Sequence, residues 1–207
     1  AAGREVVECP LSLQDGRAVM DFAAWEAALT GREKMLILCS PHNPGGRVWT
    51  VDELRAVADF CTRHDLILVS DEIHHDLVYP GQKHTVMPLA APQVADRLVV
   101  MTARTKTFNI AGAHIGNVII ADPALRKAFA ITINAMGISP NSFGMHMATA
   151  AYSPEGAAWV DDLMRSAQEV GQHFFFFFLS EAQAKQEVLE GIDTSFLFPQ
   201  HFGKNLD

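Results

Sequence analysis

The apolar residues of this chain gather in short continuous runs, separated by polar segments rich in glycine and proline. Runs without the polar alternation of a half-exposed strand are typical of strands covered on both faces in a parallel sheet. The runs that we interpret as such strands are Met35–Cys39, Leu66–Val69, Leu98–Thr102 and Gly116–Ile120. We therefore expect an α/β fold, with a mainly parallel sheet flanked by helices and right-handed crossovers.

Helical patterns precede, separate and follow these runs. Thr50 and Glu53 have the spacing of a capping box, and the apolar residues after them share one helical face. Asp122 followed by Pro123 is typical of an N-cap with proline at the first helical position. The expected helices are Phe22–Leu29, one that begins after Thr50, Ala124–Met136, Ser142–Tyr152, and one from Glu155 to about Val170.

The remaining segments carry weaker patterns. Residues 1–20 are expected to form a surface strand and loop, with a turn at Gln14-Asp15-Gly16. The segment from the second strand to Ala91 has the prolines and glycine of a loop. Phe174–Phe178 has neither a helical nor a strand period, and such a run promotes aggregation where it is exposed.

Charge and cysteine content narrow the class of protein. Sixteen Lys and Arg against 24 Asp and Glu leave no basic stripe for a nucleic-acid backbone. Cys9, Cys39 and Cys61 lie far apart, which favours free thiols in a reducing compartment. The first residues lack the pattern of a signal peptide, and no apolar run is long enough to cross a membrane. We expect a cytoplasmic protein without nucleic-acid or membrane partners.

Three polar residues follow the ends of successive predicted strands: Asn43, Asp71 and Lys106. In open α/β sheets ligands bind beyond the carboxyl ends of the strands, so the topology brings this amide, carboxylate and amine to one edge. Each also has an ordinary interpretation. Lys106 fits a solvated loop cation, Asp71 a helix or turn cap, and Asn43 a turn residue between prolines. Their joint placement favours a site.

The segments around these residues carry a resemblance to a known family. CSPHNPGGRVWT, SDEIHHDL and TKTFNIAGAHIGN, in this order, resemble the large domain of pyridoxal-phosphate-dependent class I and II aminotransferases. More narrowly, they resemble the branch of cystathionine β-lyases and cysteine-S-conjugate β-lyases. The resemblance runs from about Leu11 to Trp159 and implies an incomplete large domain of fold type I. It divides the chain into residues 1–153, the central part of this domain, and residues 154–207, a helix leading toward the small domain plus an atypical, truncated or frame-shifted tail.

The resemblance also implies roles for single residues. It makes Lys106 the catalytic lysine that binds the cofactor pyridoxal 5′-phosphate covalently, Asp71 the partner of the pyridinium nitrogen, and Asn43 a donor to the phenolic oxygen. His74 is implied as a further cofactor-binding residue of the SDEIH segment. These residue types suit the chemistry, because a carboxylate beside the ring nitrogen keeps it protonated and able to accept electrons.

Some positions depart from the family pattern at the expected phosphate site. His114 stands where many aminotransferases carry an arginine eight residues after the lysine, and Ala103 stands where a serine is common. Thr105 or Thr102 is then expected to supply the hydroxyl. Arg104 occupies a position where the branch usually has a small residue or proline. We include Thr105 and His114 among the expected cofactor-binding residues.

The implied activity is carbon–sulfur β-elimination on cystathionine or cysteine S-conjugates, giving a thiol, pyruvate and ammonia. An amino-acid aminotransferase and a non-catalytic cofactor-binding or regulatory fragment are the alternatives, and the family implies a homodimer with a small-molecule amino-acid substrate. The acidic and histidine residues of Asp71–Asp76 also raise the possibility of a metal site. The adjacent histidines lack the HExxH spacing, so we expect no metal.

Overall fold

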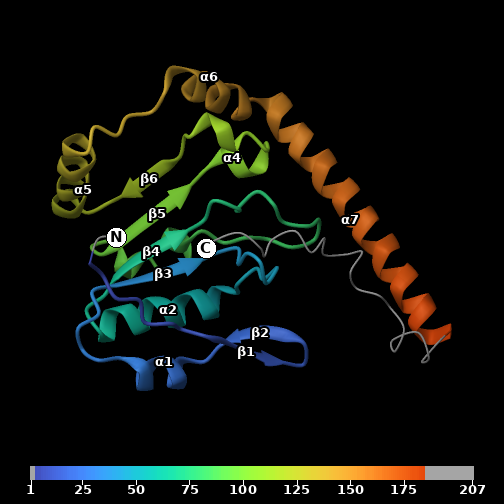
Figure 1. The fold of residues 1–207 in the computed structure, drawn as a ribbon, viewed down its shortest axis with the longest axis horizontal. Coiled ribbons are helices and arrows are strands. Elements are labelled where there is room, and N and C mark those ends of the chain that lie inside the picture. Colours follow the sequence, from blue (N-terminus) through green and yellow to red (C-terminus); the bar gives the residue numbers. More distant parts are fainter. Residues whose placement is uncertain (1–2, 185–207) are drawn as a thin grey trace, which may run out of the picture. The chain divides into compact units, whose positions relative to one another are not determined.

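The structure is a computed structural model that describes residues 3–184, with side chains described for residues 3–171. Its centre is a four-stranded sheet in the order β3 (Met35–Cys39), β4 (Ile67–Asp71), β5 (Leu98–Thr102) and β6 (Asn117–Ile120). The first three strands are parallel, and β6 runs antiparallel to β5 (Figure 1). The prediction of a mainly parallel sheet flanked by helices is confirmed.

One face of the sheet is closed by α2 (Val51–Arg63). The predicted capping box forms: the Glu53 backbone N–H donates to Thr50 Oγ1 (3.2 Å), and the Thr50 backbone N–H donates to Glu53 Oε2 (2.7 Å). This pairing satisfies two of the free donors at the helix start. The core that joins the helix to the sheet includes fully buried side chains, among them Leu54, Val57, Phe60 and Leu68.

The opposite face of the sheet is covered less completely by the described residues. Val69, Val99 and Ile120 form a small cluster there, against which Leu125 of α5 (Pro123–Ala135) packs. On the edge strand β3, however, the Ile37 side chain is 69% exposed. The prediction that Met35–Cys39 is covered on both faces is therefore wrong for this part of the chain, because no described element packs on its second face.

A hairpin and a short helix precede the sheet. The strands β1 (Leu11–Gln14) and β2 (Arg17–Met20) pair across the turn, where the sequence had indicated one strand and a loop. Helix α1 (Phe22–Ala28) begins at the Asp21 N-cap, whose carboxylate accepts from the Ala24 N–H. Buried Arg47 fixes the hairpin, since its Nε donates to the Ala18 carbonyl at 2.7 Å.

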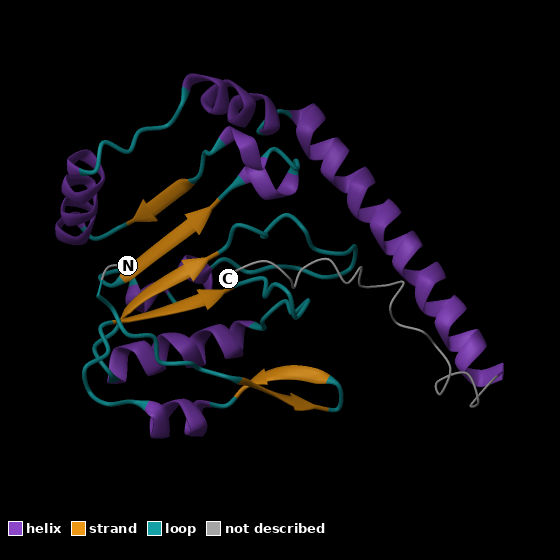
Figure 2. Ribbon diagram, viewed as in Figure 1, coloured by secondary structure: helices purple, strands orange, loops and turns teal. Residues whose placement is uncertain are grey.

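The later elements are mostly helical (Figure 2). They are α3 (Met87–Ala90), the 3-10 helix η1 (Pro92–Val94), α4 (Arg104–Thr107), η2 (Ala111–Ala113), α5, α6 (Ser142–Ala151) and α7 (Pro154–Ala184). Helix α7 was predicted to end near Val170 and instead continues through Phe174–Phe178. The side chains of these phenylalanines lie outside the described residues, so the expectation about aggregation stays a prediction.

The chain divides into two compact units, Ala1–Met164 and Arg165–Asp207. All the site residues discussed below belong to the first unit. Among the described residues, no helix combines the length and the apolar character needed to cross a membrane.

Candidate active site

The three parallel strands end at the same edge of the sheet. Cys39 of β3 lies opposite Asp71 of β4, and Asp71 lies opposite Met101 of β5. The segments that follow β3 and β5 leave the sheet at the same edge as the segment that follows β4 (Figure 2). Asn43 lies in the loop after β3, and Lys106 lies on α4, which follows β5. This is the edge at which parallel α/β sheets bind ligands.

The loop after β3 is held in shape by Cys39. Its Sγ accepts the backbone N–H of Asn43 at 3.3 Å and lies 3.3 Å from the carbonyl of Pro41. Gly45 leaves room for His42 in this loop, because a Cβ on Gly45 would lie 2.5 Å from His42 Nδ1 and the imidazole would have to shift. The loop thereby presents the exposed Asn43 side chain at the edge of the sheet.

His74 joins this loop to the other two residues. The Asn43 amide nitrogen lies 3.2 Å from His74 Nε2, so in the neutral tautomer that carries its proton on Nδ1 the amide donates and Nε2 accepts. Burial lowers the pKa of His74, and the positive charge of Lys106 lowers it further, while the Asp71 carboxylate acts in the opposite direction. His74 therefore contacts the Asn43 amide and lies near enough to Lys106 and Asp71 for both charges to shift its pKa.

Lys106 lies on the single turn of α4, where its side chain is exposed while those of Thr105 and Thr107 are buried. His114 ends η2 in a left-handed conformation with φ 44°, and its side chain is exposed. The structure thus groups Asn43, Asp71, His74 and Lys106, with Thr105 beside the lysine in sequence. A phosphate-binding role for Thr105 or His114 stays a prediction.

Two acidic residues of the segment after β4 have partners that the sequence did not reveal. Glu72 is fully buried and accepts hydrogen bonds from Ser70 Oγ (2.8 Å), the Met87 backbone N–H (2.9 Å) and His84 Nε2 (3.0 Å). Asp76 forms an ion pair with Arg104, 28 positions away. No local pattern could have found the contacts of Glu72 with Met87 and His84, or that of Asp76 with Arg104, because these partners are distant in sequence.

These partners also bear on the metal interpretation of Asp71–Asp76. Among the residues that the structure describes, no group of three or more His, Cys, Asp or Glu side chains is placed to hold a metal ion. Glu72 is engaged by His84 in the core, and Asp76 is engaged by Arg104 on another element. Glu72 and Asp76 therefore stabilise the fold around the site.

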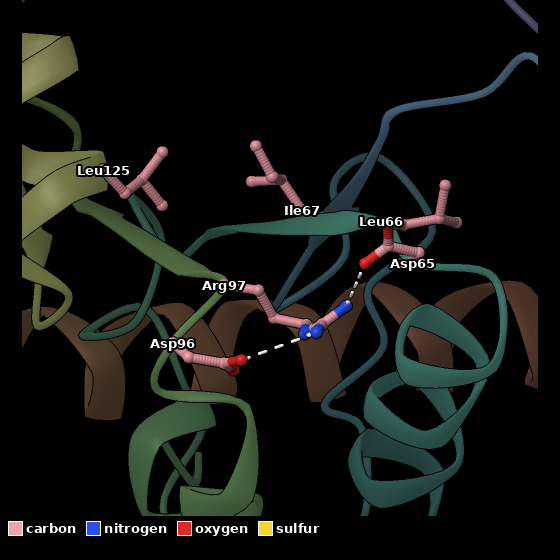
Figure 3. Close-up of a pocket in the computed structure, with 6 residues that line it drawn as sticks. All are labelled: Asp65, Leu66, Ile67, Asp96, Arg97 and Leu125. Carbon is pink, nitrogen blue, oxygen red and sulfur yellow. Dashed lines mark hydrogen bonds and ion pairs between the residues drawn. The ribbon is translucent and has the colours of Figure 1, made fainter.

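A cavity of about 220 Å³ lies elsewhere, between residues at the start of β4 and β5 and Leu125 (Figure 3). Arg97 lies in it between Asp96 (3.4 Å) and Asp65 (3.1 Å), and these carboxylates raise its pKa. Because the Arg97 charge is paired with the Asp65 and Asp96 carboxylates, the cavity has little positive potential that could attract an anion. This cavity is at the amino ends of the parallel strands, so we regard the opposite edge as the candidate active site.

Comparison with known proteins decides the family. Residues 1–178 match the sequence profile described as aminotransferase class I and II. The chain belongs to the class I and II aminotransferase family. This confirms the predicted relationship. The cofactor of this family is pyridoxal 5′-phosphate.

The chain is similar to several individual members of the aminotransferase class I and II family. It is 38% identical to cystathionine beta-lyase PatB of Bacillus subtilis over 164 residues, which are 78% of this chain and 42% of PatB. The structure of cystalysin from Treponema denticola, which contains pyridoxal 5′-phosphate, matches with 38% identity and a TM-score of 0.76, covering 83% of this chain and 45% of cystalysin. The aspartate aminotransferase of Geobacillus stearothermophilus is 34% identical over 61% of this chain and 32% of its own length. The chain thus spans less than half the length of these relatives.

Proposed function

We propose that this chain forms the ring-binding part of a pyridoxal-phosphate-dependent carbon–sulfur β-lyase, acting on cystathionine or cysteine S-conjugates. The observation that carries the proposal is the grouping of Asn43, His74, Asp71 and Lys106 at the carboxyl edge of the sheet. Each group matches one need of the cofactor ring. An amine binds the aldehyde carbon, a carboxylate holds the proton of the ring nitrogen, and an amide donates to the phenolic oxygen.

When bound, the cofactor supplies an electron sink for the pair left at Cα after proton loss. The residues of this chain do the rest. The Lys106 Nζ amine would hold the cofactor through its aldehyde carbon and, as a free amine, would take the proton from Cα of the substrate. Asp71 would keep the ring nitrogen protonated, and Asn43, whose amide contacts His74, would orient the phenolic oxygen.

In β-elimination the electron pair left at Cα would form a Cα–Cβ double bond while the Cβ–S bond breaks with its own pair leaving on sulfur, and reaction of the remaining fragment with water would give pyruvate and ammonia. Two observations favour this outcome over transamination. The SDEIH segment resembles the lyase branch, and cystathionine beta-lyase PatB is similar over 78% of this chain, compared with 61% for the aspartate aminotransferase. Transamination of amino acids is the second candidate function, and the similarity of the chain to the aspartate aminotransferase of Geobacillus stearothermophilus supports it.

The test begins with cofactor binding. The purified chain mixed with pyridoxal 5′-phosphate is expected to develop the visible absorption of a lysine-bound cofactor, and Lys106→Ala is expected to lose it. Lys34→Ala is the matched control, because Lys34 is an exposed lysine at the amino end of β3, on the opposite edge of the sheet. A chain that stays colourless would contradict cofactor binding.

The second stage separates the two reactions. Incubation with cystathionine is expected to release pyruvate and a free thiol without any added keto acid. A new keto acid that forms only when a second keto acid is supplied would contradict the lyase and favour the aminotransferase. A chain that binds the cofactor at Lys106 but turns over neither substrate would favour a non-catalytic binding fragment.

A further inference from the structure

Asp76 contacts the short helix that carries Lys106. The Thr107 hydroxyl donates to Asp76 Oδ2 at 3.0 Å, and the Arg104 guanidinium forms an ion pair with the same oxygen. The other carboxylate oxygen lies 3.4 Å from His75 Nε2. The Asp76 and Arg104 side chains are only 17% and 20% exposed, so solvent screens this ion pair less than a surface pair.

The helix that Asp76 holds has little stability of its own. Helix α4 is a single turn, Arg104–Thr107, and its N-cap Ala103 provides no side-chain hydrogen bond. One turn fixes several backbone dihedrals for very few hydrogen bonds, so its stability has to come from tertiary contacts. Asp76 supplies two of these contacts, at the first and last residues of the turn, on either side of Lys106 in sequence.

A second contact supports the arginine from the other side. The Arg104 guanidinium carbon lies 4.2 Å from the centre of the Tyr152 ring, within the range of a cation–π interaction. The Tyr152 hydroxyl accepts a hydrogen bond from Asn117 Nδ2 at 3.1 Å. Arg104, which departs from the small residue or proline of the related branch, is therefore packed between Asp76 and Tyr152.

We propose that Asp76 is a positioning residue for Lys106, holding α4 through Arg104 and Thr107 so that the amine stays above the carboxyl edge of the sheet. Asp76 is five positions after Asp71 on the same segment. The segment that begins with Asp71, the proposed partner of the ring nitrogen, thus also holds Lys106 in place through Asp76. This role rests on the proposed function of Lys106 as the cofactor lysine.

The experiment measures where the cofactor attaches. The chain is incubated with pyridoxal 5′-phosphate and reduced with borohydride, and peptide mass spectrometry gives the label on Lys106 relative to the other lysines. Wild type is expected to label Lys106 preferentially. Asp76→Ala is expected to lower this ratio about tenfold. A displacement of about 1 Å at a reacting group can slow the reaction on the order of a hundredfold, and a tenfold loss corresponds to a smaller displacement of the Lys106 amine. Asp76→Asn should lie between, since its amide oxygen still accepts from Thr107.

Controls separate positioning from folding. Asp59→Ala, an exposed aspartate on α2, should keep the wild-type ratio. All ratios are measured well below the thermal midpoint of each variant, where a residue that only stabilises the fold would leave the ratio unchanged. If Asp76→Ala does not fold, Asp76→Asn and Thr107→Val decide, and each should lower the ratio.

Two outcomes would overturn the inference in different ways. Preferential labelling of Lys106 in wild type, with unchanged ratios in the Asp76 and Thr107 variants, would refute the positioning role and leave the proposed function standing. Wild-type labelling spread evenly over the lysines would refute the proposed function, and the positioning role with it.

Discussion

Replacing Glu72 by alanine tests whether the segment after β4 is anchored as the structure shows. The Glu72 carboxylate is fully buried and accepts from the Met87 N–H, His84 Nε2 and Ser70 Oγ. The alanine variant would leave these donors without an acceptor in the core. The serine hydroxyl can rotate toward another partner, but the Met87 N–H and the 95% buried His84 side chain cannot reach water easily.

The expected cost follows from these contacts. A buried donor that loses its partner costs about 1–3 kcal/mol, and breaking a buried ionisable pair costs about 3–5 kcal/mol. We expect Glu72→Ala to lower the free energy of unfolding by about 3–5 kcal/mol, a large share of the roughly 5–15 kcal/mol typical of a domain. Glu72→Gln should lose less, because its amide oxygen still accepts from the Met87 N–H.

Urea denaturation monitored by tryptophan fluorescence is the assay, since Trp25 and Trp49 are buried in the same unit. With a slope of about 1–3 kcal/mol per molar urea, the Glu72→Ala midpoint should move by more than about 1 M. Glu8→Ala, at an exposed position, is the control and should stay within about 0.5 kcal/mol of wild type. A Glu72→Ala midpoint equal to that of the control would refute the buried anchor.

The remaining predictions concern the site itself. Gly45→Ala should weaken cofactor binding, measured by absorbance titration, because its Cβ would come within 2.5 Å of His42 and displace the Asn43 loop. Lys106→Met should raise the pKa of His74 in an NMR titration, because it removes a positive charge that lowers this pKa. Stability should also fall as the pH drops below about 6.5, since the unfolded state then binds protons that folded His74 resists, and His74→Gln should reduce this fall.

The first two of these predictions have matched controls. Gly112→Ala should leave cofactor binding unchanged, because a Cβ there meets nothing within 4 Å and its φ is not in the left-handed region. Lys34→Met, at the opposite edge of the sheet, should leave the His74 titration curve in place. Equal loss of binding in both glycine variants, or an unchanged His74 titration in Lys106→Met, would contradict the geometry of the site.

The sequence predicted those features that local patterns determine. The capping box at Thr50 and Glu53 forms as expected, and the strand Leu98–Thr102 has the predicted bounds. The convergence of Asn43, Asp71 and Lys106 followed from topology, because residues after parallel strand ends share one edge. These conclusions needed only the nearest neighbours in sequence and the order of the strands.

Other features depend on contacts between distant residues, which no local pattern reveals. The ion pair between Asp76 and Arg104 joins two elements. In the sequence, Arg104 could be interpreted only as a departure from the family pattern. The run Met35–Cys39 predicted a strand but not which of its faces would be covered, and Ile37 is exposed. The antiparallel direction of β6 was equally invisible, since an apolar run gives no strand direction.

A crystal structure of this chain grown with pyridoxal 5′-phosphate tests the central claim most directly. We predict electron density for the cofactor that is continuous with Lys106 Nζ, with the ring nitrogen within hydrogen-bonding distance of the Asp71 carboxylate and the phenolic oxygen near the Asn43 amide. Density attached to a different lysine, or a ring nitrogen turned away from Asp71, would contradict the assignment of this site.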